Sequence, residues 1–125
     1  NGMPAYRDIV FIVNGDRAVR DSLRFVVELD GMNVRTCSSC AELLAHPELD
    51  SGCCAVVDGK TLDGDGADIL ARLERGRDLL PIVLIADHIG RRRFHRVVSE
   101  GLFSVVDQPV LDDALLRCIR ALRKP

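Results

Sequence analysis

The sequence predicts one small parallel α/β domain, and three observations carry that prediction. The 125 residues fit a single domain near the commonest domain size. Short apolar runs rich in β-branched residues recur along the chain, as is typical of strands that are covered on both faces. Segments with apolar residues at helical spacing separate these runs, so strands and helices alternate.

The first predicted unit is a strand, a short turn and a helix. The strand is expected at 8–13, a nearly continuous apolar run. Asp16 can cap the following helix, and Asp30-Gly31 stops its pattern. The apolar positions of this helix are Val19, Leu23, Val26 and Val27.

The middle of the chain continues the alternation. Residues 33–36 predict a brief second strand. Ser39 and Glu42 have the spacing of a capping box, which starts a short second helix ahead of two leucines. A third strand is expected at 54–58, and a glycine-rich stretch at 59–66 leads to a third helix.

The C-terminal part repeats the pattern. The fourth strand is predicted at 81–86, and a helix from about 91 to 100 ends at Gly101. The fifth strand is expected at 102–106. A final helix follows, with an apolar stripe made of Leu111, Leu115, Cys118, Ile119 and Leu122.

This alternation implies right-handed crossovers and a parallel sheet with helices on both sides. In such sheets, ligands bind beyond the carboxyl ends of the strands. The turns that contain Asn14, Asp58, Ala86 and Asp107-Gln108 should therefore lie together. Asp58 is the carboxylate that closes the central strand, where a purely structural role would be to cap the next turn.

Composition and charge limit the function classes. The formal net charge of −2 argues against strong attraction to nucleic acid, and no apolar run approaches the roughly 20 residues of a membrane span. Residues 1–6 lack the pattern of a secretory signal and are expected to be a flexible or expression-derived leader. We therefore expect a cytoplasmic protein whose domain binds neither membranes nor nucleic acid.

The five cysteines are expected to be reduced thiols, since an odd number leaves at least one unpaired. Cys37 and Cys40 have redox-motif spacing, and a helix start could lower the pKa of Cys40, but incidental small residues are the favoured alternative. A four-thiol zinc site with Cys53 and Cys54 is disfavoured, because Cys37 closes one parallel strand while Cys53 opens another. Cys118 is expected in the core.

Several short segments keep the order and spacing of a known family. They are 9–23, Val57-Asp58, Asp65-Gly66, 80–85, Glu100-Gly101 and Pro109. On these residues, almost the whole chain resembles the receiver domain of bacterial two-component response regulators, the nitrogen-fixation type most closely. The resemblance implies a flavodoxin-like (βα)5 fold, a three-layer sandwich whose parallel five-stranded sheet has the order 2-1-3-4-5.

In that family, an Asp closing the third strand accepts a phosphoryl group from a histidine kinase, and Asp58 matches this position. The carboxylate acts as a nucleophile and forms an acyl phosphate. Attack on a negatively charged donor requires positive charge, which such sites supply with magnesium and a lysine.

The residues that would hold magnesium are altered. Receivers carry two adjacent acidic residues after the first strand, but this chain has Asn14 and Gly15 there. Asp16, next along, is more simply a helix cap. Because magnesium prefers carboxylate oxygens in octahedral geometry, we expect it to bind weakly at Asp58 at most.

Other altered positions concern the phosphoryl group and the switch. Ala86 replaces a Ser or Thr hydroxyl, and Gln108 replaces a lysine that would pair with phosphate. Val105 stands in place of the usual aromatic switch residue, and Leu62 in place of a proline. The apolar framework is kept, so we infer a degenerate receiver, or pseudo-receiver.

Lys60 suggests a compensation for the missing charges. It lies two residues after Asp58, and its ammonium could fill the vacated cation site by reaching that carboxylate. A solvated loop lysine is the alternative.

The densest basic cluster is expected at the start of the fourth helix, where backbone amides favour anions. Its members are Arg91, Arg92, Arg93, His95 and Arg96. It could be a solvated helix face, a partner-docking surface, or a site for a small anionic ligand such as a cyclic dinucleotide. In the family, the fourth helix, the fifth strand and the last helix often form a homodimer or effector face, to which His95, Arg117 and Arg120 could contribute.

The predicted function is a receiver-like, non-enzymatic signalling module that acts by protein contact, with a histidine kinase or another signalling protein as partner. Phosphorylation of Asp58 with groups supplied by the partner is one alternative. A sensor of small anionic ligands is the other.

Overall fold

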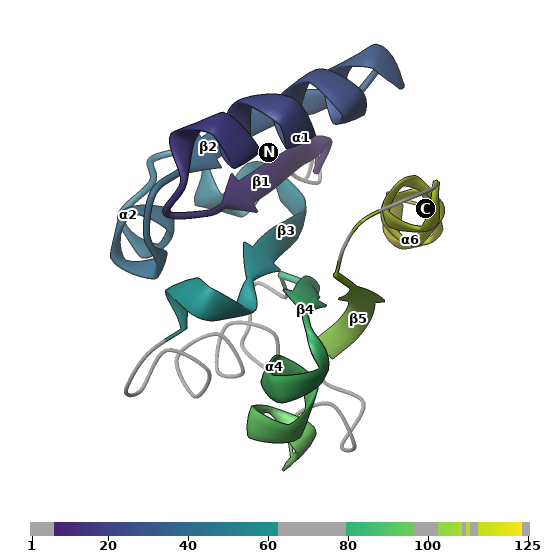
Figure 1. Cartoon of the computed structure of the whole chain (residues 1–125). Helices are drawn as coiled ribbons and strands as arrows, with labels where there is room; N and C mark the ends of the chain where they lie inside the picture. Colours follow the sequence, from purple (N-terminus) through teal and green to yellow (C-terminus); the bar gives the residue numbers. More distant parts are fainter. Residues whose placement is uncertain (1–6, 63–79, 97–102, 109, 111–112, 124–125) are drawn as a thin grey trace.

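The computed structural model describes residues 7–62, 80–96, 103–108, 110 and 113–123. Its five strands form one parallel sheet in the order β2-β1-β3-β4-β5 (Figure 1), which confirms the predicted order and the flavodoxin-like fold. The strands are β1 (Ile9–Val13), β2 (Asn33–Cys37), β3 (Gly52–Asp58), β4 (Ile82–Ala86) and β5 (Phe103–Asp107). They differ from the predicted strands only at their ends, β3 beginning at Gly52 rather than at Cys54.

Helices cover both faces of this sheet. One apolar layer packs under α1 (Arg17–Leu29) and α6 (Ala114–Arg123), and the other packs under α2 (Cys40–Leu44) and α4 (His88–Arg93) (Figure 1). All five residues of β1 are buried, because this strand lies between β2 and β3 and side chains of a strand alternate between the two layers.

The first helix is capped as the sequence predicts. Oδ1 of Asp16 accepts hydrogen bonds from the N–H groups of Ala18 and Val19, at 2.9 and 3.3 Å. The helix ends at Leu29, and Gly31 adopts a φ of +87°, a conformation that glycine accommodates without strain.

The apolar stripe predicted for this helix is wider than the face it buries. Val27 is fully buried and Leu23 partly buried, but Val19 and Val26 are 41% and 43% exposed. A single helix lying on a sheet buries a narrow stripe, so valines at its margins stay in contact with water.

The second helix is short, and its capping box is displaced. Oγ of Ser39 accepts from the Glu42 N–H at 3.1 Å, as predicted. The Glu42 carboxylate accepts from the N–H of Ser38 at 2.9 Å, whereas a standard box would use the N–H of Ser39. The hydrogen bonds from Ser38 lower the pKa of Glu42.

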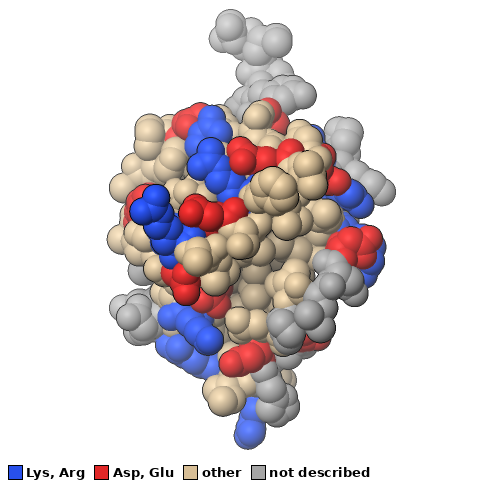
Figure 2. Space-filling view, turned by 45° about the horizontal axis from the view of Figure 1, so that its top comes forward, with Lys and Arg blue, Asp and Glu red and all other residues tan. Residues whose placement is uncertain are grey.

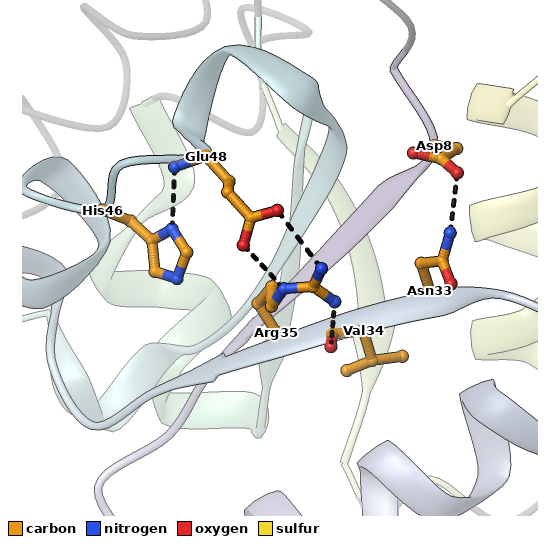
Figure 3. A network of polar contacts seen from close by, with 6 residues as sticks. All are labelled: Asp8, Asn33, Val34, Arg35, His46 and Glu48. Carbon is orange, nitrogen blue, oxygen red and sulfur yellow. Dashed lines mark hydrogen bonds and ion pairs between the residues drawn. The ribbon is translucent and has the colours of Figure 1, made fainter.

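The segment that leads into β3 is tied to β2 by an ion pair (Figure 3). Arg35 donates to Glu48 through Nε at 2.8 Å and through a terminal nitrogen at 3.2 Å. Nδ1 of His46 accepts from the Glu48 N–H at 3.1 Å. The guanidinium of Arg35 lowers the pKa of Glu48, although partial burial of the carboxylate opposes this effect.

The helix after β4 begins earlier than predicted. Its N-cap is Asp87, whose Oδ1 accepts from the Gly90 N–H at 2.7 Å, so α4 starts at His88 and not near residue 91. The glycine at position 90 hides this start from a search for apolar periodicity. Residues 97–102, where the predicted helix ends, lie outside the described residues.

Charges are mixed on the surface. The face in Figure 2 carries Lys and Arg side chains interspersed with Asp and Glu, in agreement with the small net charge of −2. No helix in the described part of the chain has the length and hydropathy needed to cross a bilayer.

Candidate functional site

The carboxyl ends of the strands meet at one edge of the sheet. Asn14 follows β1, and its N–H donates to the carbonyl of Cys37, at the end of β2, at 3.1 Å. Gln108 follows β5, and its N–H donates to the carbonyl of Ala86, at the end of β4, at 3.0 Å. Asp58 ends β3, between β1 and β4. The structure therefore places at one edge the positions that the sequence predicted to lie there.

The carboxylate of Asp58 is partly buried and caps a 3₁₀ turn, Gly59–Thr61. Its Oδ1 accepts from the Lys60 N–H at 3.4 Å, and the Thr61 hydroxyl donates to the Asp58 carbonyl at 2.6 Å. The capping role considered from the sequence is thus present. Within the described residues, Oδ2 has no hydrogen-bond partner, so one oxygen can still meet a ligand or a phosphoryl donor.

The ion pair proposed between Lys60 and Asp58 is not formed in this structure. The ion pairs within the described ranges all use arginine as the cation. Lys60 contacts the carboxylate through its backbone N–H, and the turn that makes this contact leaves its side chain exposed. Lys60 is thus an exposed loop lysine in this structure, which was the alternative considered from the sequence.

The two oxygen-bearing side chains after β1 are committed to the start of α1. Asn14 is only 6% exposed and is the one buried polar residue of the described part. Its Oδ1 accepts from the Asp16 N–H at 2.8 Å, while Asp16 caps the helix. Gly15, between them, is exposed, and a Cβ there would meet only a methyl group of Thr61, at 3.9 Å.

This arrangement does not fit a magnesium ion. Mg²⁺ requires near-octahedral oxygen ligation and is usually held by one or two carboxylates together with phosphate and water. Oδ1 of Asn14 and Oδ1 of Asp16, which could assist Asp58, already accept backbone hydrogen bonds, and Gly15 between them has no side chain. No group of three or more His, Cys, Asp or Glu side chains able to hold a metal ion occurs in the part of the chain that the structure describes.

Two cavities open beside Asp58. One, of about 220 Å³, lies next to α4 and is lined in part by Lys60, Arg93 and Phe94. The other, of about 180 Å³, lies next to α1, and Asn14 lines it. Asp58, Ile85 and Gln108 line both. The candidate phosphoacceptor therefore borders two spaces that a small group could enter.

Sequence reasoning missed Phe94, the aromatic residue of this region. Its side chain is 5% exposed and belongs to the apolar layer that contains Ala86, against which the partly buried Val105 also packs. The guanidinium of Arg93 lies 5.0 Å from the ring centroid. An aromatic group thus enters this layer from the end of α4, while β5 contributes a valine. The sequence feature that could have pointed to Phe94 is a single aromatic residue within an arginine-rich segment.

Three members of the basic cluster are not at the start of α4, so for them that part of the interpretation was wrong. Arg91, Arg92 and Arg93 occupy the second half of α4, where backbone amides no longer favour anions. Arg92, Arg93, His95 and Arg96 are exposed; the side chain of Arg91 lies outside the described residues. Their exposure is what both a solvated helix face and a partner-docking surface require.

The cysteines do not assemble into the sites considered from the sequence. Cys37 ends β2 and Cys53 lies near the start of β3, at the opposite edge of the sheet, as predicted. Burial raises the pKa of Cys37 to about 11, which keeps it a thiol at neutral pH and disfavours a redox role with Cys40. All five cysteines are reduced thiols, and Cys118 packs against the apolar layer under α1 and α6.

Not every residue that was singled out by the family resemblance lies in the candidate site. Asp65-Gly66, Glu100-Gly101 and Pro109 lie outside the described residues. Leu62, at the position where a proline was expected from the resemblance, is fully buried in the layer under α2 and α4.

Comparison with known proteins gives a family match over most of the chain. A model of the response regulator receiver domain matches residues 10–120. The response regulator protein TodT of Pseudomonas putida is 26% identical over 117 residues, which cover 93% of this chain and 51% of TodT. The transcriptional regulatory protein FixJ of Bradyrhizobium diazoefficiens is 27% identical over 114 residues, covering 90% of this chain and 55% of FixJ. The chain thus spans about half the length of these relatives.

Solved structures share the fold. A response regulator receiver domain protein from Clostridium thermocellum gives a TM-score of 0.79 at 20% identity and covers 92% of this chain and 93% of its own. Full-length FixJ from B. japonicum gives a TM-score of 0.77 at 26% identity and covers 94% of this chain and 58% of its own.

Proposed function

Because this chain belongs to the response regulator receiver domain family, we propose that it is an atypical receiver, which signals by protein contact and is phosphorylated at Asp58 poorly if at all. One observation carries the proposal. Oδ1 of Asn14 and Oδ1 of Asp16 accept backbone hydrogen bonds at the start of α1, and position 15 is a glycine, so Asp58 lacks the adjacent acidic pair that would support a magnesium-assisted reaction.

The electrostatics around Asp58 support a slow reaction. A carboxylate that attacks a phosphoryl donor must overcome repulsion between two anions, and catalysis of such transfers depends on cations placed around the phosphoryl oxygens. Gln108 supplies no charge at the position where a lysine would. Lys60 and Arg93 line the cavity next to α4, but neither forms an ion pair with Asp58 among the described residues.

The conformational response would also be altered. Ala86 has no hydroxyl with which to contact a phosphoryl oxygen, and Val105 has no ring that could change its packing. We propose instead that the surface of α4, β5 and α6 contacts a histidine kinase, another signalling protein or a second copy of the chain. Exposed Ile89, at 75%, and the exposed arginines of α4 supply apolar and charged contacts on this surface.

One alternative keeps a supporting observation. Oδ2 of Asp58, which has no hydrogen-bond partner among the described residues, and the adjoining cavities leave room for phosphotransfer when a kinase supplies the missing groups. The anionic-ligand alternative loses its main support, because the arginines are not at the start of α4.

The test is to incubate the protein with a small phosphodonor, with and without magnesium, and to weigh it intact. Asp58→Asn, which keeps the shape of the side chain, is the matched control. We expect no gain of a phosphoryl mass in either condition within a time that labels an ordinary receiver fully. A magnesium-dependent gain that Asp58→Asn abolishes would contradict the proposal. Labelling that requires a kinase would support the alternative.

A further inference from the structure

Two consecutive cysteines of β3 lie on the same face of the sheet. In a regular strand, successive side chains point to opposite faces. The pairing of β1 with β3 shifts, however, so that Ile9 lies opposite Gly52 and Val10 lies opposite Cys54. Cys53 is therefore the extra residue of a β-bulge, a feature that re-aims side chains.

The core layers show the effect of this bulge. Ala55 and Val57 belong to the layer under α2 and α4, as their odd positions require. Cys53, also odd, belongs instead to the layer under α1 and α6, together with Cys54 and Val56. The two thiols therefore share one environment, and α6 packs against the strand that carries them.

The separation of the sulfurs decides what the pair can do. Their Sγ atoms lie 3.9 Å apart, and the residues are 6% and 0% exposed. A disulfide would require them to approach to about 2.05 Å between adjacent residues of a strand that is paired with β1 on either side of Cys53. An atom bonded to both at about 2.3 Å, with the roughly 95° bond angle of a trivalent centre, spans about 3.4 Å, so bridging requires the sulfurs to approach by about 0.5 Å, far less than a disulfide requires.

The chemistry of the pair suits a soft ligand. The contact between the two thiols lowers the pKa of Cys53 and, together with burial, raises the pKa of Cys54, so Cys53 is the more readily ionised thiol of the pair. Zn²⁺ and similar ions need two further ligands. The described residues contain no group of three or more metal-binding side chains, so the pair alone would leave such an ion incomplete.

We propose that Cys53 and Cys54 form a two-sulfur binding site for a trivalent thiophilic metalloid, of which arsenous acid is the simplest example. Arsenous acid is small and uncharged at neutral pH, so burial of the thiols does not exclude it. Two As–O bonds are replaced by two As–S bonds, each thiol proton leaves with a hydroxide as water, and the arsenic keeps its third hydroxyl. No electron is transferred. The site is independent of the function proposed for Asp58.

The experiment treats the fully reduced protein with excess arsenite and counts bound arsenic by intact mass under native conditions. We expect one arsenic per chain, with at least a tenfold weaker apparent affinity in Cys53→Ala and in Cys54→Ala. Cys37→Ala and Cys40→Ala are the matched controls and should bind as the wild type does. Circular dichroism checks that each variant is folded.

A second measurement needs no variant. X-ray absorption at the arsenic edge of the wild-type complex should show two sulfur neighbours and one oxygen. Absence of binding at excess arsenite, binding that survives both Cys53→Ala and Cys54→Ala, or binding lost in the Cys37 or Cys40 controls would each overturn the site.

Discussion

Arg120 of α6 donates a hydrogen bond from Nε to Oδ2 of Asp30, the C-cap residue that follows α1, at 2.9 Å. Ninety positions separate the two residues in the chain, and their contact joins the ends of two helices that cover the same face. The hydrogen bond from Arg120 lowers the pKa of Asp30.

We therefore expect Arg120→Ala to lower the melting temperature slightly at neutral pH. A carboxyl group whose pKa is lowered on folding stabilises the protein above its ordinary pKa of 3.8, and this contribution is lost as the pH falls through the lowered value. The difference between variant and wild type should thus disappear in acid. Arg117→Ala, which breaks the pair with Asp113 at the start of α6, is the control and should leave the junction of the two helices unchanged. Melting curves measured from neutral pH down to acid test this; a difference that grows in acid contradicts it.

Restoring the acidic pair should restore metal binding. The double variant Asn14→Asp/Gly15→Asp adds the carboxylates that the site lacks, and the open surroundings of Gly15 accept a side chain. We expect at least a tenfold gain in Mg²⁺ affinity, measured by calorimetry. Asn14→Asp/Gly15→Asn is the control with one carboxylate fewer. Equal affinities in the wild type and the double variant would show that other features prevent binding.

The short helix α2 provides a matched pair of neighbouring leucines. Leu43 is fully buried, while Leu44 is 37% exposed. We expect Leu43→Ala to lower the free energy of unfolding by about 2–5 kcal/mol, because it leaves a cavity in the core. Leu44→Ala should cost far less. The free energies of unfolding of the two variants, measured with denaturant, test this prediction. Equal losses of stability would mean that α2 does not bury Leu43 more deeply than Leu44.

Gly52 should not tolerate a methyl group. A Cβ at this position would lie 2.8 Å from side-chain carbons of both Leu80 and Phe11. We expect Gly52→Ala to destabilise the protein by about 1–3 kcal/mol through overpacking. Gly15→Ala, at an exposed position, should stay within about 0.5 kcal/mol of the wild type. Chemical denaturation compares them; a neutral Gly52→Ala would mean that the two neighbours move aside freely.

The sheet could be predicted from the sequence because its strands are buried on both faces, which leaves a distinctive β-branched apolar run at each one. The start of α4 could not, since Asp87 is followed by His88, Ile89 and Gly90, which show no helical periodicity. Its position depends on the capping hydrogen bond of Asp87, a contact that becomes visible only in three dimensions.

The positions of the candidate site followed from topology, because parallel strands end at a common edge. The contact that Lys60 makes with Asp58 could not be predicted, because the 3₁₀ turn after Asp58 decides which atoms of Lys60 meet the carboxylate. The placement of Cys53 was equally hidden. A bulge depends on how β3 pairs with β1, and within the local sequence Cys53 and Cys54 are simply two residues of an apolar run.

The complete burial of β1 has a consequence for how the domain assembles and opens. A parallel strand gains its hydrogen bonds only after a crossover segment has brought the next strand alongside, and β1 needs two such neighbours. Its amide protons bond alternately to β2 and β3, so the whole set is released only when both neighbours detach. We expect the amide protons of β1 to exchange last with deuterated water. Their exchange rate is then the reference with which faster exchange at α6 can be compared.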